Sequence, residues 1–139
     1  MSTKDSKQGL QVLQPPGWPR PKGYSNGIAA SGRQVFVGGM IGWDEKEQFP
    51  SDDFIDQAEQ ALKNTVAVLA EAGATPEHIV RMTWYVTDKQ DYLSRLPEVG
   101  KIYRSQLGYN FPAMALLQIV ALVEDRAKVE IETTAVIPA

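Results

Sequence analysis

Hydrophobic residues between positions 53 and 72 recur at the spacing of one face of a helix. The positions three or four apart are Ile55, Ala58, Leu62, Val66 and Leu69. Ser51 or Asp52 is a suitable N-cap residue, and Gly73 suits the position after the C-cap because glycine tolerates left-handed backbone. The pattern predicts a helix from about Asp53 to Ala72 with one buried stripe.

A second helical pattern runs from about Asp91 to Leu107 and is closed by Gly108. Its apolar line contains Tyr92, Leu96, Val99, Ile102, Tyr103 and Leu107. Pro97 interrupts the pattern, and a proline inside a helix removes a backbone hydrogen bond. We therefore expect a first turn, a kink and then the main helix.

Shorter apolar segments, several rich in β-branched residues, have the length and composition of strands. They are residues 11–14, 27–30, 34–39, 79–86, 114–122 and 128–136. Side chains alternate along a strand, so Met82, Trp84 and Val86 share one face of the fourth segment. We expect the turn at 124–126 to join the last two strands as a hairpin.

The predicted order is β-β-β-α-β-α-β-β, which is typical of an α+β fold with one mixed sheet. Two helices must bury their apolar stripes against one face of that sheet. The opposite face mixes apolar side chains with Glu and Thr. A half-polar face in so small a protein favours packing between subunits, with polar residues lining the clefts.

The composition of the chain limits the kinds of catalytic and metal sites that it can form. The 139 residues fit one domain spanning 1–139, in which we expect the polar residues 1–9 to be flexible. Without cysteine there is no thiolate nucleophile, and His78 is the single histidine, so clustered His or Cys metal sites are excluded. The net charge of −3 and the absence of a signal or spanning segment favour the cytoplasm, without nucleic-acid or membrane partners.

Carboxylates are the remaining candidates for catalysis. Glu130 and Glu132 are two positions apart on a predicted strand and so project from the same face. In a partly apolar cleft either could act as a general acid or base. Spacing alone favours a plainer interpretation, in which both are solvated or form ion pairs at an interface.

Aromatic residues offer a second set of candidates. The four that could line a pocket are Trp18, Tyr24, Trp43 and Trp84. Taken one at a time, such residues more often belong to a core or an interface. The segment from Pro15 to Gly27 is too rich in proline and glycine for regular structure, and we expect its aromatics to pack on a neighbour.

Several motifs, in their order and spacing, resemble the Rid (reactive intermediate deaminase, YjgF or L-PSP) family over about residues 22–137. The first helix carries Gln57, Leu62, Asn64 and Gly73 at the family's spacing. Phe111-Pro112-Ala113 precedes the strand segment 114–122, and the segment 129–136 resembles the family's C-terminal signature.

The resemblance implies a chorismate-mutase-like α+β fold and a homotrimer with an inner barrel of sheets and three clefts between subunits. It also implies hydrolysis of reactive enamines or imines to a carbonyl compound and ammonia, with no metal or organic cofactor. Tyr24 matches the family's cleft tyrosine, Gly39 the glycine whose backbone approaches the substrate, and Glu130 the glutamate that positions the attacking water. The resemblance and the search for candidate carboxylates thus lead to the same residue, Glu130, which weakens the plainer interpretation drawn from spacing alone.

The chain departs from the family where the deaminase subgroup has an arginine directly after Phe-Pro-Ala. Met114 stands there and cannot compensate the desolvation of a substrate carboxylate. Met40, Met114 and Trp84, with Trp43 as a further candidate, would make the cleft wider and more apolar. We therefore expect poor activity on small amino-acid-derived imines and a preference for larger or less acidic ones, with Glu132 near the substrate.

Alternatives to this deaminase remain open. A non-catalytic trimer could use the same cleft to bind a small molecule or stabilise another protein. A chorismate-mutase-like isomerase would need clustered cations for a dicarboxylate, which Met114 argues against. The family's older description as endoribonucleases finds neither a basic groove nor a suitable histidine in this chain.

Overall fold

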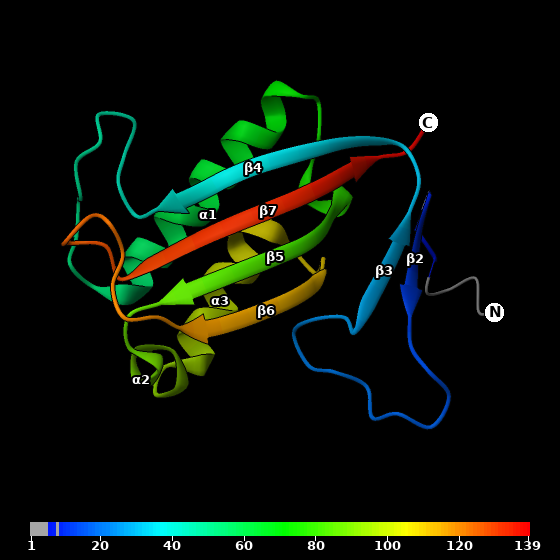
Figure 1. The fold of residues 1–139 in the computed structure, drawn as a ribbon, viewed down its shortest axis with the longest axis horizontal. Coiled ribbons are helices and arrows are strands. Elements are labelled where there is room, and N and C mark those ends of the chain that lie inside the picture. Colours follow the sequence, from blue (N-terminus) through cyan, green and yellow to red (C-terminus); the bar gives the residue numbers. More distant parts are fainter. Residues whose placement is uncertain (1–5, 8) are drawn as a thin grey trace.

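A four-stranded mixed sheet forms the body of the molecule (Figure 1). The computed structural model describes residues 6–7 and 9–139. The strands lie in the order β4 (Arg33–Ile41), β7 (Val129–Ile137), β5 (Ile79–Val86) and β6 (Ala113–Gln118). Strands β5 and β6 are parallel, and β7 runs antiparallel to both of its neighbours. The predicted α+β class is confirmed.

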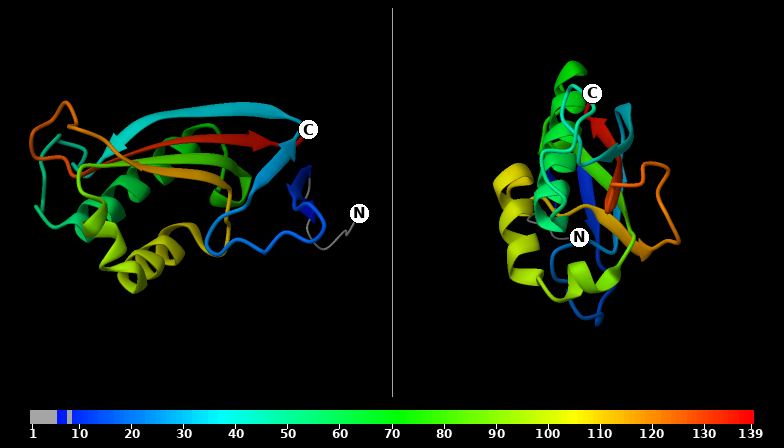
Figure 2. Two further views of the ribbon diagram at one scale, coloured as in Figure 1. Left: turned by 60° about the horizontal axis from the view of Figure 1, so that its bottom comes forward. Right: turned by 90° about the vertical axis from the view of Figure 1, so that its left-hand side faces the viewer.

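Both long helices cover the same face of this sheet, as Figure 2 shows. Helix α1 (Phe54–Glu71) packs against α3 (Leu96–Leu107), β4 and β7. The core between the layers includes the predicted Ile55, Ala58, Leu62 and Leu69 of α1 together with Met82, Trp84 and Val86 of β5. Burial of large apolar side chains between two layers is the main stabilising contribution to such a domain.

The ends of α1 follow from local chemistry. Asp53 is the N-cap residue, and its carboxylate accepts a hydrogen bond from the backbone N–H of Asp56. At the other end the chain turns at Gly73, whose φ is +76°, and Ala74 N–H donates to the Leu69 carbonyl at 3.0 Å. A left-handed glycine with such a bond is a common helix stop. The predicted helix boundaries are confirmed within one residue, but the cap expected at Ser51 or Asp52 is Asp53, because the helix begins at Phe54.

The second helical stretch is divided as expected around its proline. A short helix, α2 (Lys89–Leu93), comes first and α3 begins at Leu96. Pro97 lies in the first turn of α3, where its missing N–H costs nothing because that group has no helical partner.

The predicted hairpin between the last two strands is wrong. β5 lies between β6 and β7, so these two strands are not neighbours. The segment β5–α2–α3–β6 is a βαβ unit, which brings β6 parallel to β5 at the sheet edge. β6 also ends at Gln118 rather than at Leu122, because its partner β5 ends at Val86. Residues 119–128 form a loop instead.

The N-terminal strands form a second sheet, whereas a single sheet was expected. It has the order β1 (Ser6–Lys7), β2 (Leu10–Leu13) and β3 (Gly27–Ala30), and β3 pairs with β2. Ser25 anchors this sheet by donating its N–H to the Pro112 carbonyl at 2.9 Å. Residues 1–9 were expected to be flexible. Most of them, residues 1–5 and 8, lie outside the described residues, so the prediction stays untested there.

Two polar residues of the first-helix motif fasten loops to the sheet. The buried Gln57 donates to the carbonyls of Ser51 and Arg126 and accepts from Lys128 N–H. Asn64 donates to the carbonyls of Ile41 and Trp43 at 3.1 and 2.8 Å. These contacts satisfy backbone groups where the strands end, and they position β4 and β7.

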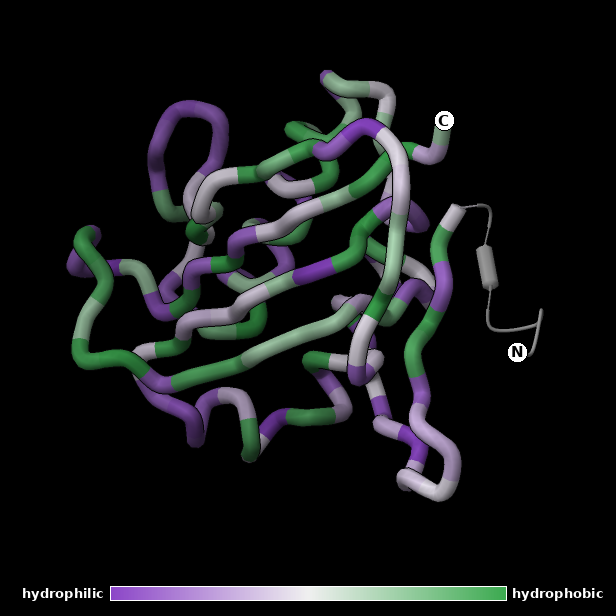
Figure 3. Tube along the Cα trace, turned by 45° about the vertical axis from the view of Figure 1, so that its right-hand side comes forward, coloured by the Kyte–Doolittle hydropathy of each residue, from purple (hydrophilic) through white to green (hydrophobic). Residues whose placement is uncertain are grey.

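No helix covers the other face of the four-stranded sheet (Figure 2). Phe36 is 71% exposed and Leu117 is 43% exposed. Val120 and Val123 are fully exposed in the loop after β6, and Figure 3 shows residues 119–123 as a continuous hydrophobic segment at one end of the molecule. Within the described residues, no helix is long and apolar enough to span a membrane.

Candidate functional site

An irregularity in β4 brings Glu130 against Gly39. The register between β4 and β7 shifts between Val37 and Met40, so the glycine pair 38–39 is looped out of regular pairing. A Cβ atom at position 39 would lie 2.7 Å from Cδ of Glu130, so the side chain of Glu130 occupies the space that glycine leaves free. The half-buried Glu130 makes no hydrogen bond or ion pair within the described residues. It is therefore free to bind water or a ligand.

Glu132 lies on the same face but is already held. The hydroxyl of Tyr85 donates to Oε1 of Glu132 at 2.6 Å. This hydrogen bond raises the pKa of Tyr85, with smaller contributions from burial and from the charges of Glu132 and Glu130. The predicted pair of glutamates therefore shares a face, and only Glu130 keeps a carboxylate without a partner there.

Trp84 and Met114 lie on the opposite, helix-covered face of the sheet. Both line a cavity of about 270 Å³ between the edge strand β6 and helix α3, which we call the β6–α3 pocket. Its other lining residues include Tyr92, Val99, Tyr103 and Phe111. Trp84 is 1% exposed, and its indole meets the ring of Tyr92 edge-on at 6.4 Å between centroids. The pocket wall is therefore largely apolar, with four aromatic rings from Trp84, Tyr92, Tyr103 and Phe111.

The predicted site residues therefore fall into two groups that one chain does not bring together. Pairing of Trp84 with Ile131 and of Tyr85 with Glu130 places Trp84 and Glu130 on opposite faces, because side chains alternate along a strand. Met40 packs against the core beside Ile131. Trp43 lies in the loop after β4, with its ring 6.0 Å from that of Phe49.

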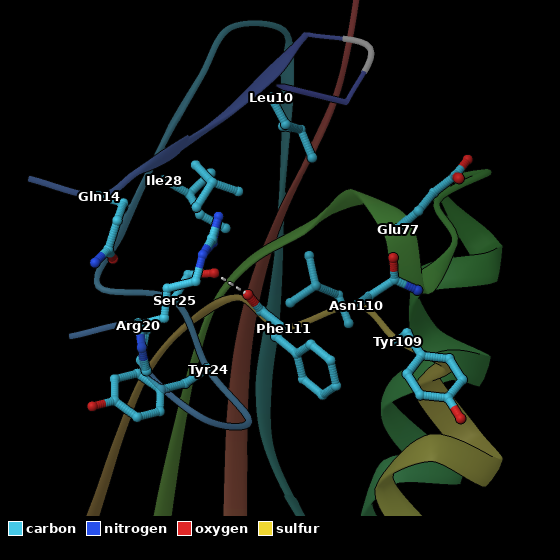
Figure 4. A pocket seen from close by; sticks show the side chains of 13 residues that line it. Leu10, Gln14, Arg20, Tyr24, Ser25, Ile28, Glu77, Tyr109, Asn110 and Phe111 are labelled. Carbon is cyan, nitrogen blue, oxygen red and sulfur yellow. Dashed lines mark hydrogen bonds between the residues drawn. The ribbon is translucent and has the colours of Figure 1, made fainter. Parts of the chain in front are cut away.

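Tyr24 has a third location. It is 42% exposed and lines a cavity of about 240 Å³ between the N-terminal sheet and the start of β6 (Figure 4). Tyr109 and Phe111 contribute to this cavity from the opposite side. Gly23, one residue earlier, lines the β6–α3 pocket, and Phe111 contacts both cavities. The segment 23–24 therefore forms part of the wall between them.

Several pocket residues were missed because they had been assigned to a helix stripe. Tyr92 and Tyr103 were expected to be core residues, and burial raises the pKa of both. The Tyr103 ring stacks on Phe111 at 5.6 Å, and its hydroxyl donates to the Asn110 carbonyl. Arg104 also lines the pocket. Arg104 follows Gly100 by four positions, so the two lie on the same face of a helix. This spacing was the signal in the sequence that could have identified Arg104.

In the described part of the chain, no three His, Cys, Asp or Glu side chains are grouped so that they could hold a metal ion. The chemical resources are instead a free carboxylate on one face, and an aromatic pocket with one guanidinium on the other.

Comparisons with known proteins agree with this picture. A family model described as Endoribonuclease L-PSP matches residues 19–137. A human protein named 2-iminobutanoate/2-iminopropanoate deaminase is 32% identical over 114 residues, which cover 81% of this chain and 79% of that protein.

Solved structures share the fold. The Rid-family protein YyfB from Yersinia pestis has a TM-score of 0.82 at 27% identity and covers 93% of this chain and 99% of that one. A YjgF-family protein from Mycobacterium tuberculosis has a TM-score of 0.62 at 33% identity and covers 84% and 88%. The match over residues 19–137 and the common fold confirm the resemblance of the motifs, and the chain belongs to the L-PSP family, also called the Rid or YjgF family.

Proposed function

We propose that this protein hydrolyses a reactive enamine or imine to a carbonyl compound and ammonia. In this proposal, Glu130 positions the attacking water and accepts a proton from it. The observation that carries the proposal is the half-buried Glu130 carboxylate, which lies against Gly39 and has no partner within the described residues. The name of the human relative, a deaminase of 2-iminobutanoate and 2-iminopropanoate, supports the reaction class.

The proposed reaction needs only water and acid–base groups. Water adds through its oxygen to the imine carbon while Glu130 accepts a proton from it. That proton passes to nitrogen and gives a carbinolamine. The hydroxyl proton of the carbinolamine then moves to the nitrogen, the C–N bond breaks, and ammonia leaves as the carbonyl forms. An enamine first takes a proton at carbon to give the iminium ion, which becomes the imine by losing a proton from nitrogen. A positioned carboxylate contributes typically about 10²–10⁴-fold to such steps.

The β6–α3 pocket is the proposed place for the body of the substrate. Its volume of about 270 Å³ exceeds the roughly 150 Å³ cavity that holds benzene in an engineered protein core. Met114 and Trp84 present apolar surface where a small 2-imino acid would need a cation. A substrate with a larger apolar body than 2-iminobutanoate fits this lining better.

A second copy of the chain is needed to bring Glu130 and the β6–α3 pocket together in one site. Glu130 projects from the uncovered face, whereas the β6–α3 pocket lies on the helix-covered face beside the edge strand β6. The exposed Phe36 and Leu117 on that face, with Val120 and Val123 beside it, favour its burial against other subunits. We propose a homotrimer in which the Glu130 face of one subunit closes the pocket of the next. Light scattering at micromolar concentration tests it, and a monomer mass would refute it.

The decisive assay is ammonia release from imines generated in situ, ranging from small aliphatic to bulky aromatic members. Glu130→Gln should lower kcat/KM by about 10²-fold or more while the fold and assembly persist. Glu132→Gln is the matched variant, because it removes the neighbouring carboxylate that Tyr85 already holds. We expect a clearly smaller loss there.

Two results would count against the proposal. Undiminished turnover in Glu130→Gln would remove that residue from the mechanism. No turnover by the intact protein across the whole panel, from a sample shown to be folded and assembled, would favour the non-catalytic binding function instead.

A further inference from the structure

Helix α3 carries a glycine and an arginine one turn apart at the wall of the β6–α3 pocket. Gly100 and Arg104 both line this pocket. A Cβ atom at position 100 would lie 2.8 Å from Nη1 of Arg104, so the guanidinium folds back over Gly100. Glycine inside a helix costs roughly 1 kcal/mol relative to alanine. The space it leaves for the guanidinium gives this glycine a structural purpose.

Arg104 has no anionic partner in the part of the chain that the structure describes. Two other arginines do form ion pairs. Arg95 pairs with Asp53 and Glu98, and Arg126 pairs with Asp52. Arg104 therefore presents a solvent-exposed cation at the mouth of an otherwise mainly apolar, aromatic pocket. A guanidinium in that position is suited to a carboxylate, which it binds with two parallel hydrogen bonds.

A second, independent observation concerns Trp84, another residue that lines the same pocket. Trp84 Nε1 is buried and has no hydrogen-bond acceptor within the described residues. Most buried polar groups in proteins do have a partner. The pocket is thus lined by a tryptophan with an unsatisfied donor and by an arginine without an anionic partner among the described residues, and a ligand that carries oxygen acceptors suits such a lining.

We infer that Arg104 binds the carboxylate of the ligand, and that the β6–α3 pocket takes an organic acid with an aromatic or similarly bulky apolar body. The identification of this ligand as the substrate rests on the proposed deaminase function. The cation reaches the pocket from helix α3 rather than from position 114 on β6. A small 2-imino acid held at Arg104 would leave much of the pocket unfilled. A longer acid can fill the pocket with its apolar body while its carboxylate reaches the guanidinium.

The test uses unreactive probes, 3-phenylpropanoate and its neutral analogue 3-phenylpropanamide, with titration calorimetry on the intact assembled protein. The wild-type protein should bind the carboxylate about tenfold more tightly than the amide, as a charge-assisted hydrogen bond implies. Arg104→Gln should reduce the carboxylate affinity to that of the amide and leave amide binding unchanged. Lys101→Gln removes one positive charge from the same helix outside the pocket, and it should preserve the preference.

Gly100→Ala provides a variant that keeps the charge. Its Cβ should displace the guanidinium and weaken carboxylate binding severalfold, with amide binding retained. Equal affinities of the two probes for the wild-type protein would overturn the inference, as would an equal loss in Lys101→Gln and Arg104→Gln. If Arg104→Gln loses both probes, an unchanged preference in Gly100→Ala would also overturn it.

The binding assay and the ammonia assay separate this inference from the proposed function. A carboxylate preference that depends on Arg104, without any ammonia release, would retain the anion site and refute the deaminase. Turnover that depends on Glu130, without a carboxylate preference that depends on Arg104, would support the deaminase and refute the anion site.

Discussion

The contact between Gly39 and Glu130 allows the proposed catalytic carboxylate to be moved without being removed. In Gly39→Ala the new Cβ would lie 2.7 Å from Cδ and 2.9 Å from Cγ of Glu130. Both distances are shorter than a van der Waals contact between carbon atoms, which is about 3.5–4.0 Å. The carboxylate must therefore shift by roughly an ångström. Because it is the end of a flexible side chain, the fold should tolerate the change.

The expected consequence is a large loss of activity with a small loss of stability. Misplacing a reacting group by about 1 Å can cost about 10²-fold in rate. We expect kcat/KM for ammonia release to fall by that order in Gly39→Ala. The unfolding free energy should change by no more than about 1 kcal/mol, the scale of a minor steric adjustment in a side chain.

Gly38→Ala is the matched control on the neighbouring residue. A Cβ at position 38 would meet nothing within 4 Å, and neither glycine has the left-handed φ that would strain an alanine. Ammonia release and thermal unfolding of both variants should be measured on the same substrate. Full activity in Gly39→Ala, or an equal loss in both variants, would refute the proposed role of the Glu130 position.

Two further predictions concern stability. Gln57→Leu should lower the unfolding free energy by about 3 kcal/mol in denaturant titrations, because it removes three buried hydrogen bonds to backbone groups; a change below 1 kcal/mol would contradict this anchoring role. Asp53→Asn keeps the helix cap but loses the ion pair to Arg95, whose hydrogen bond lowers the pKa of Asp53 in the folded state. Such a carboxyl stabilises the fold above its ordinary pKa near 3.8, and the contribution disappears as the pH falls through the lowered value. The Tm difference between wild type and Asp53→Asn should therefore be constant near neutrality and shrink below about pH 4, and a pH-independent difference would exclude the linkage.

Much of the fold could be read from the chain because local patterns determine it. The stripe of α1 and the left-handed Gly73 are short-range features, and each was where the sequence predicted. The capping residue is Asp53 rather than the expected Ser51 or Asp52. The kinked second helix followed from Pro97 for the same reason. The pairing of the last strands was missed because the order of strands in a sheet depends on contacts between distant segments, which a turn at 124–126 does not report.

The candidate site was only partly determined by sequence. Alternation along a strand was enough to place Glu130 and Glu132 on one face, and the family motifs selected Glu130 between them. That Met114 and Trp84 lie on the opposite face depends on which strand pairs with which, and on which side the helices cover. Only the tertiary structure decided this, because burial by packing layers, rather than local pattern, determines which side of a strand faces the core.

The role of Arg104 illustrates the same limit. The sequence alone determined that this arginine follows Gly100 by one helical turn. It did not determine that the pair would face an aromatic pocket formed by β5, β6 and the segment at Gly23, which are remote in the chain. Short-range order is encoded by neighbouring residues, whereas the chemical surroundings of a side chain arise only when distant elements pack together.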